Sequence, residues 1–419
     1  MASSFDVVVI GAGIAGIAAA KTARAKGLRV ALIEAKDRIG GRAYTDDAAL
    51  GVPFDHGCYW MHSASQNPFV SIADRLGFVY RKNSFRNRRL YLRNRWATAG
   101  EKRDWTAYDA RNERAIEKAG RAGRDVAVAD VIEHGSRWEP LFGAWVAAFS
   151  GADPDQISAL DWFNYKNTEE NWPVRDGFGA LVAAWGAEVP VSLGCPATRI
   201  DWSGRTLRVA TPRGTLEARA AIVTVSTGVL AAETIRFSPA LPDRKREAIA
   251  GVPMGRADKV GIAFDRDVFG MPATSGVSFV ADKPEAFGFQ IRPFGRTVAV
   301  CHLGGRFAGA LEKDGERAMI AYARERLAKM FGATIKKRIV AAQASRWEAD
   351  PFIRGGYAAA LPGSAHMRAR LGETLGRSLF FAGEATHAAF FSTAHGAYMS
   401  GVNAAESVIK QIRRGKARG

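Results

Sequence analysis

The sequence contains few cysteines and no long run of apolar residues. Its 419 residues include three cysteines, Cys58, Cys195 and Cys301, which lie far apart and form neither a disulfide framework nor C-x-x-C metal spacing. The longest apolar stretches, such as 218–232, are interrupted and too short to span a bilayer. No secretory signal precedes the first expected strand. We therefore expect a soluble, cytoplasmic protein that does not bind a membrane.

Repeats, low-complexity linkers and clusters with metal-ligand spacing are absent from the sequence as well. His387 and His395 could suggest a metal, but we interpret them as structural hydrogen-bonding groups, and no metal is expected.

Acidic residues are outnumbered, with 42 Asp and Glu against 59 Lys and Arg, which gives a formal net charge of +17. The basic residues cluster in 80–96, 111–124 and the tail 413–418. The first cluster alternates apolar and charged positions, which predicts a half-exposed hairpin rather than a nucleic-acid surface. A solvated basic face is the preferred interpretation, and a nucleic-acid partner is not expected.

The N-terminal residues carry a dinucleotide-binding pattern. The apolar run 5–10 is typical of a strand buried on both faces. Gly11, Gly13 and Gly16 follow in G-x-G-x-x-G spacing, before an Ala-rich helix expected over 14–25. The first glycine permits a tight turn, the second lets the backbone approach a pyrophosphate, and the third lets the helix pack on the strand.

The residues around these glycines complete the pattern. Ile14 and Ala15 begin the helix whose N-terminus faces the phosphates. A second strand over 28–33 ends at Glu34, about 20 residues after the glycines, where an acid hydrogen-bonds a ribose hydroxyl, and Ala35 follows it. The combination predicts dinucleotide binding.

The segment EAKDRIGGRAYT favours FAD over NAD. It contains Arg38, Gly41 and Arg42, and a second glycine-bearing turn with a guanidinium suits a long dinucleotide whose pyrophosphate needs a bidentate donor. The segment resembles the E-a-x-x-R-x-G-G-R motif that supports FAD in flavin-dependent amine oxidases. The alternative is a basic surface turn.

Further motifs in the same order extend this resemblance over most of the chain. The chain is similar to flavin monoamine and polyamine oxidases, the family that also holds the lysine-specific histone demethylases. The matching segments are FDHGCYWMHS (54–63), CPATRIDW (195–202), IVTVSTGVLAAETIRFSPALPDRKREAI (222–249), GRADKVGIAFD (255–265), SRWEADPFIRGGY (345–357) and LFFAGEATHAAFFSTAHGAYMSG (379–401).

The resemblance implies an α/β fold with two domains. A Rossmann-like FAD-binding domain would be assembled from the discontinuous segments 1–75, 189–244 and 371–419. A mixed α+β substrate domain would comprise 76–188 and 245–370.

The same resemblance implies roles for five residues near the reacting atoms. Lys259 would hold a water near the flavin atom that accepts hydride. Tyr357 would form one aromatic wall in front of the flavin, and Thr393 stands where monoamine oxidases have a second aromatic residue. Trp60 and His62 would border the substrate tunnel.

Other residues would contact the cofactor. Ala197 lies in the strand whose backbone would face the adenine, Gly383 and Glu384 would lie along the ribityl-pyrophosphate part, and Ala394 begins the last helix at the flavin pyrimidine edge. Trp347 would pack near the isoalloxazine ring. Mitochondrial-type monoamine oxidases attach FAD through a cysteine before the aromatic wall residue; this chain has glycine there, so noncovalent FAD is expected.

The expected reaction is oxidation of an amine by hydride transfer from its α-carbon to FAD, with O2 as acceptor and H2O2 as product. The segment 392–396 resembles the S-T-x-H-G of polyamine oxidases, which favours a polyamine or secondary amine, although a primary amine is also possible. Glu169 and Glu170 are candidates to attract a distal ammonium, or are simply solvated.

Several alternatives remain. An L-amino-acid oxidase has the same fold but tends to carry arginine where this chain has Trp60. A flavin desaturase or dehydrogenase, or a basic nucleic-acid-binding protein that retains a flavin, are further possibilities. A histone demethylase would be expected to bring a chromatin module and a long helical insertion. The oligomeric state leaves no readable trace.

Local patterns also predict individual elements. We expect helices over 68–76, 111–135, 138–149, 315–331 and 396–412, and strands over 190–200, 206–211, 220–225, 260–264, 297–302 and 379–382.

Overall fold

The computed structural model describes residues 4–82 and 87–416 and contains two seven-stranded sheets. The first sheet runs in the order β12–β9–β10–β11–β1–β2, with β18 paired to β11. Its centre is parallel, because β1 pairs with β2 and β11, and β11 pairs with β18, in parallel register. Its strands are β1 (Ser4–Ile10), β2 (Val30–Ile33), β9 (Arg199–Asp201), β10 (Leu207–Thr211), β11 (Gly214–Val223), β12 (Arg236–Ser238) and β18 (Leu379–Phe381).

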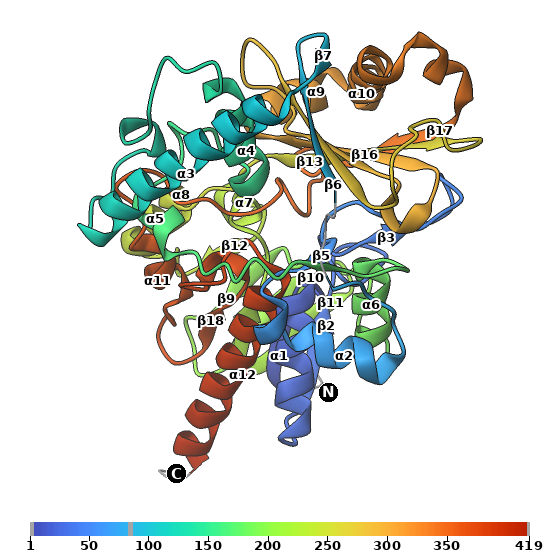
Figure 1. The fold of residues 1–419 in the computed structure, drawn as a ribbon. Coiled ribbons are helices and arrows are strands. Elements are labelled where there is room, and N and C mark those ends of the chain that lie inside the picture. Colours follow the sequence, from blue (N-terminus) through green and yellow to red (C-terminus); the bar gives the residue numbers. More distant parts are fainter. Residues whose placement is uncertain (1–3, 83–86, 417–419) are drawn as a thin grey trace.

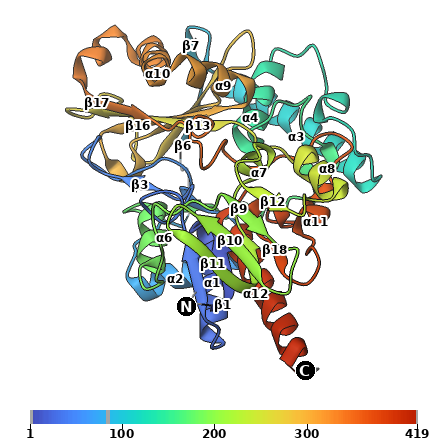
Figure 2. The ribbon, with the colours of Figure 1, turned by 180° about the vertical axis from the view of Figure 1, so that it is seen from behind.

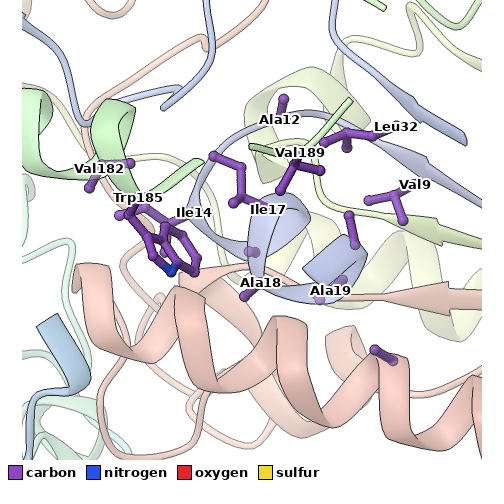
Figure 3. Packing of buried hydrophobic residues seen from close by; sticks show 14 of the residues in the cluster. Val9, Ala12, Ile14, Ile17, Ala18, Ala19, Leu32, Val182, Trp185 and Val189 are labelled. Carbon is purple, nitrogen blue, oxygen red and sulfur yellow. The ribbon is translucent and has the colours of Figure 1, made fainter. Parts of the chain in front are cut away.

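The core of this first half forms on both faces of β1. Val7 and Val9 pack on one face and Val8 and Ile10 on the other, and all four are buried. Figure 3 shows α1 (Ile14–Ala25) between these strands and the last helix, α12 (Ala394–Lys416). The N-terminal helix α1 and the C-terminal helix α12 therefore pack against each other, in the lower part of Figure 1.

The second sheet has the order β17–β13–β16–β15–β14–β6–β7. One face packs on α9 (Gly305–Asp314) and α10 (Glu316–Phe331), in a core that includes Val260, Ile262, Cys301, Phe289 and Leu327. Because side chains alternate along a strand, the other face turns toward the first half of the molecule (Figure 2). Its strands are β6 (Asn87–Leu92), β7 (Arg95–Trp96), β13 (Ala257–Phe264), β14 (Ser275–Val280), β15 (Gly288–Ile291), β16 (Val298–Gly304) and β17 (Ile339–Ala344).

Smaller elements complete the two halves. Two short pairs connect them, β3 (Thr45–Asp46) with β4 (Phe54–Asp55) and β5 (Trp60–Met61) with β8 (Trp172–Pro173). The remaining α-helices are α2 (Pro68–Leu76), α3 (Ala99–Arg121), α4 (Glu139–Ser150), α5 (Ala159–Asn164), α6 (Phe178–Gly186), α7 (Thr227–Ala231), α8 (Asp243–Gly251) and α11 (Met367–Gly372). Within the described ranges, no helix is both long and apolar enough to cross a membrane.

Most predicted elements are confirmed, and three are wrong in extent. The strand predicted over 220–225 is β11, which begins at Gly214 and ends at Val223. The helix predicted over 111–135 begins earlier, because Thr98 and Glu101 form a capping box, and it ends at Arg121, just before Gly123 at φ +67°. The strand predicted over 190–200 is a strand only from Arg199, since Pro196 has no N–H to donate to a neighbour. The basic hairpin is present as β6 and β7, while residues 83–86 of that cluster lie outside the described residues.

Candidate active site

A cavity of about 560 Å³ lies between the two sheets and is lined by residues of both. It extends from the glycine-bearing turn after β1 to the face of the second sheet that carries Lys259. The lining includes Gly11, Gly13, Ile14, Ala15, Glu34, Ala35, Gly41, Arg42, Trp60, His62, Ala197, Lys259, Trp347, Tyr357, Gly383, Glu384, Thr393 and Ala394. The structure thus brings together most residues that the sequence selected.

At one end of the cavity, backbone N–H groups are available for an anion. Gly13 is the N-cap residue of α1, so the cap has no side chain to accept the first N–H groups of the helix. A Cβ atom added to Gly13 would meet its nearest neighbour, the Cα of Gly41, only at 4.0 Å. Gly16 differs, because its Cβ would lie 1.8 Å from the Gly11 carbonyl oxygen. Gly16 therefore allows the helix α1 to pack closely on the turn after β1, whereas Gly13 leaves space in the cavity for a ligand.

Glu34 stands beside this helix start. Its carboxylate accepts hydrogen bonds from the N–H groups of Ala12, at 2.7 Å, and Lys36, at 2.9 Å. These bonds fix the carboxylate between the turn after β1 and the end of β2. The side chain lines the cavity, where a ribose hydroxyl would reach it.

The two arginines of the predicted FAD motif have different positions. Arg42 lines the cavity and donates to the carbonyl of Gly356, at 2.7 Å, and to Glu384, at 2.9 Å. Arg38 donates to the carbonyl of Gly41, at 2.9 Å, and its guanidinium lies 4.0 Å from the centre of the Tyr44 ring. Arg38 therefore supports the glycine turn by a hydrogen bond. It does not line the described cavity, whereas Arg42 does.

The segment after β18 forms the wall opposite Arg42. Gly383 has φ +145°, which only glycine adopts readily, and a Cβ there would meet no atom of the described chain within 4 Å. Glu384 accepts from Arg42 and from the N–H groups of Ala358, at 3.1 Å, and Ser392, at 2.9 Å. The buried carboxylate therefore holds three segments of the wall together.

Lys259 lies on β13, on the side of the cavity that the second sheet forms. Its ammonium donates to the carbonyl of Asp55, at 3.1 Å, and to that of Gly57. Burial lowers the pKa of Lys259 to about 8, although the nearby Asp55 carboxylate opposes the shift. Asp55 itself accepts the N–H groups of Phe178 and Gly179 at the start of α6, which fixes the loop beneath the lysine.

Trp60, His62 and an additional histidine surround Lys259. Trp60 stacks on His302 with ring centres 5.6 Å apart, and His302 is paired with Lys259 across β13 and β16. Burial, with a smaller effect of the Lys259 charge, lowers the pKa of His302 to about 3, so the ring is neutral. His62 bonds to the amide oxygen of Asn171, and burial lowers its pKa as well.

His302 was missed by sequence reasoning. It follows the apolar run Val298–Cys301 on a predicted strand, and the motif that contains Lys259 does not indicate which strand pairs with it. A single histidine at the end of a largely apolar predicted strand was the signal that could have found it.

Tyr357 and Thr393 both line the cavity. Tyr357 donates its hydroxyl to the carbonyl of Ala148, at 2.5 Å, and burial raises its pKa. Thr393 donates to the carbonyl of Phe390, at 2.6 Å, and accepts the N–H of Gly396, at 3.0 Å, so it caps the start of α12. The N-terminus of α12 thereby points at the cavity, since Ala394 lines it.

Trp347 lines the cavity too, with its indole N–H donated to the carbonyl of His56, at 3.2 Å. Glu169 and Glu170 do not line the described cavity; Glu170 accepts the N–H of Ser65 and the hydroxyl of Thr168. Among residues 4–82 and 87–416, no group of three His, Cys, Asp or Glu side chains has the arrangement to hold a metal ion.

These features fit a long dinucleotide with a ring system at one end. The glycine turn and helix start suit a pyrophosphate, Glu34 suits a ribose, and the far end is walled by Trp60, Trp347 and Tyr357. Residues 84–409 match the family described as flavin containing amine oxidoreductase, and residues 9–76 match the NAD(P)-binding Rossmann-like domain.

The chain belongs to the flavin containing amine oxidoreductase family. Among curated proteins it is 30% identical to polyamine oxidase 4 of Oryza sativa subsp. japonica over an alignment of 453 positions, which covers 98% of this chain and 90% of that protein. It is 26% identical to lysine-specific histone demethylase 2 of Homo sapiens, with coverage of 96% of this chain and 53% of that protein. The resemblance predicted from the motifs is confirmed.

Solved structures of this family share the fold. A putrescine oxidase triple mutant superposes with a TM-score of 0.83 at 19% identity, covering 97% of this chain and 99% of that one. Cyclohexylamine oxidase from Brevibacterium oxydans superposes with a TM-score of 0.80 at 22% identity, and the alignment covers 98% of this chain and 100% of that one. The predicted fold, a discontinuous Rossmann-like FAD domain with a mixed α+β substrate domain, is confirmed. The enzyme is an FAD-dependent amine oxidoreductase, and glycine at position 356 agrees with noncovalent attachment.

Proposed function

We propose that this enzyme oxidises an amine at the carbon next to nitrogen and passes the electrons to O2. Bound FAD supplies the two-electron acceptor. The neutral amine loses a hydride from its α-carbon and a proton from its nitrogen, and it leaves as an imine. Water then hydrolyses the imine to an aldehyde or ketone and an amine or ammonia, while O2 takes up two electrons and two protons and leaves as H2O2.

One observation carries the proposal: Lys259, the only lysine on β13, is buried in the part of the cavity lining that the second sheet forms, whereas the nucleotide motif lies on the first sheet. With its pKa near 8, Lys259 is able to hold a water molecule and exchange a proton with it near neutral pH. Trp60, His302 and Tyr357 would enclose the reacting carbon in a largely dry, aromatic site. The polyamine oxidases at 30% identity support an amine as the substrate.

The cavity favours an amine over an α-amino acid. Arg368 lines it but is bound to Asp161, and Arg42 is bound to Glu384. Arg88 lies on β6 and lines the cavity. Because β6 is four strands away from β13 in the sheet, the backbones of Arg88 and Lys259 are separated by about 19 Å. We therefore propose that the α-carboxylate of an amino acid reacting beside Lys259 would lie too far from Arg88 to be bound by it.

O2 as acceptor and a cytoplasmic location belong to the same proposal. The three cysteines are unpaired thiols, as expected for a reducing compartment. The domain boundaries predicted from the sequence, 1–75, 189–244 and 371–419 against 76–188 and 245–370, are likewise proposed.

The test is the stoichiometry of the products. Purified holoenzyme is mixed with an amine in air-saturated buffer, and H2O2, the carbonyl product and the consumed O2 are measured together. We expect equal amounts of all three. Carbonyl formation without peroxide, supported only by an added dye or quinone, would exclude O2 as the acceptor and indicate a dehydrogenase.

A further inference from the structure

The second sheet gives the cavity an almost uncharged floor. Lys259 on β13 is paired with His302 on β16, His302 with Gly288 on β15, and Gly288 with Ser278 on β14. Paired residues point to the same face, so these side chains form one row across the cavity. The row leads from Lys259 to Ser278 over about 14 Å, with neutral histidine, glycine and serine after the lysine.

A second row lies two residues further along the strands. It contains Gln290 on β15, Gly276 on β14 and Arg88 on β6, which are paired in that order. Burial lowers the pKa of Arg88, and the nearby carboxylates of Asp109 and Glu169, neither of which lines the cavity, oppose this shift. In the two rows of the floor, the ionised side chains are therefore cationic.

The wall above the floor is a continuous chain of aromatic rings. Phe287 contacts Trp145, and Trp145 contacts Phe149, in each case with ring centres 5.2 Å apart. Phe149 then contacts Tyr165, at 5.1 Å, and Tyr165 contacts Phe391, at 5.4 Å. All five rings line the cavity, so its substrate half presents flat apolar surface.

The carboxylates of the cavity lining are engaged elsewhere. Asp161 forms a buried two-point ion pair with Arg368, at 2.6 and 2.7 Å. Asp258 follows the alternation of β13 to the other face, where Ser345 donates to it, and burial beside Glu312 raises its pKa well above the usual value. Glu34 and Glu384 belong to the nucleotide half, with the contacts described above.

We infer that the substrate is a monoamine with a ring or another compact apolar body, and that a second ammonium group is excluded. This inference rests on the proposed amine oxidation and adds the substrate class. It runs against the names of the polyamine oxidases to which the chain is 30% identical, since a polyamine brings further positive charges into the cavity.

A comparison of the free energies indicates that a second ammonium group is excluded from the cavity and not bound there. Burial of an ammonium without a carboxylate partner costs several kcal/mol, whereas a cation–π contact with the aromatic wall returns about 0.5–2 kcal/mol. The aromatic wall therefore does not compensate for the missing acid.

The test uses three amines with the same ring: benzylamine, para-xylylenediamine and mono-N-acetyl-para-xylylenediamine. The rate of reduction of the bound flavin is measured for each under anaerobic conditions by rapid mixing. We expect benzylamine and the acetylated diamine to reduce the flavin. For the free diamine, the ratio of the reduction rate constant to the dissociation constant should be about a hundredfold lower than for benzylamine. The acetylated compound controls for size, because it keeps the length and removes the distal charge.

A matched pair of variants tests the cause. Gln290→Glu places a carboxylate on the floor, and the ratio of diamine to benzylamine should rise at least about tenfold. Gln290→Met changes the same side chain without adding charge and should leave that ratio as in the parent enzyme.

The outcomes separate the two proposals. A diamine that reduces the flavin as fast as benzylamine, or faster, overturns the monoamine inference and leaves amine oxidation intact. If neither these amines nor a panel of other monoamines and polyamines reduces a flavin that dithionite does reduce, amine oxidation itself fails, and the inference fails with it.

Discussion

Arg42 and Glu384 form an ion pair at 2.9 Å although they are 342 positions apart in the chain. The same guanidinium binds the carbonyl of Gly356, so three segments meet at one side chain. Glu384 is almost fully buried and Arg42 is partly exposed, with 6% and 24% of their side chains accessible. The contact between the glycine- and arginine-bearing segment 34–45 and the last motif of the sequence thus forms part of the wall of the flavin cavity.

Replacement of one partner should therefore cost more than the loss of a surface ion pair. Arg42→Met leaves the Glu384 carboxylate buried without its cation, and we expect a loss of about 3 kcal/mol in unfolding free energy together with weaker retention of FAD. Chemical denaturation and released-flavin fluorescence measure the two effects. The double variant Arg42→Met/Glu384→Gln should recover part of the loss; additive losses would contradict a direct coupling.

A comparison of two glycine variants separates cofactor binding from folding. Gly16→Ala forces a Cβ to within 1.8 Å of the Gly11 oxygen, so the apoprotein itself should be destabilised. Gly13→Ala has 4.0 Å of clearance in the protein, so the apoprotein should keep its stability while FAD affinity falls at least about tenfold. Thermal unfolding of both apoproteins and FAD titration give the answer. Equal loss of apoprotein stability would show that Gly13 has only a structural role.

The buried pair Arg368–Asp161 has an exposed counterpart that serves as a control. The side chains of the buried pair are 3% and 1% accessible, and those of Arg306 and Asp155 are each 54% accessible. Arg368→Met should lower the unfolding free energy by about 3–5 kcal/mol, and Arg306→Met by less than about 1 kcal/mol. Similar losses in urea denaturation would contradict the assigned burial.

Lys259 should impose a pH dependence on flavin reduction. Its pKa of about 8 lies below the usual 10.5, so we expect an inflection near pH 8 in the reduction rate. Lys259→Met should remove this inflection and slow reduction or reoxidation about a hundredfold or more, with the flavin still bound. The reduction rate is measured by stopped-flow absorbance in the parent enzyme and in Lys259→Met. The same amine is used for both proteins, so that protonation of the substrate affects the two pH profiles equally.

The same shift affects stability with a defined sign. Between pH 8 and 10.5 the unfolded chain binds a proton at Lys259 that the folded chain has lost, so the lysine's contribution makes folding more favourable as pH rises through this window. Denaturation of parent and Lys259→Met proteins across that range should show a steeper rise for the parent. Parallel curves would mean that the lysine is not desolvated.

Short local patterns predicted the elements that bind the nucleotide. The helices Ile14–Ala25 and Pro68–Leu76 have the predicted bounds, because a glycine or an asparagine cap and a following glycine mark their ends in the sequence. Arg42 and Glu384 were each selected from a motif, but the bond between them joins distant segments and could not be predicted from either motif alone.

Other features depend on contacts between strands. His302 acquires its position from the pairing of β16 with β13, which the sequence does not state. Arg38 and Arg42 belong to one motif, and only the backbone of the glycine turn decides which of them enters the cavity. Glu169 and Glu170 were candidates from charge alone; neither lines the cavity, and the Glu170 carboxylate accepts the N–H of Ser65.

Anaerobic mixing of the purified yellow holoenzyme with benzylamine tests the central claim most directly. FAD-dependent amine oxidation predicts that the flavin absorbance bleaches in a single turnover, that one carbonyl product forms per flavin, and that the colour returns when O2 is admitted. A flavin that stays oxidised with benzylamine, with other monoamines and with polyamines, yet is reduced by dithionite, would contradict the account.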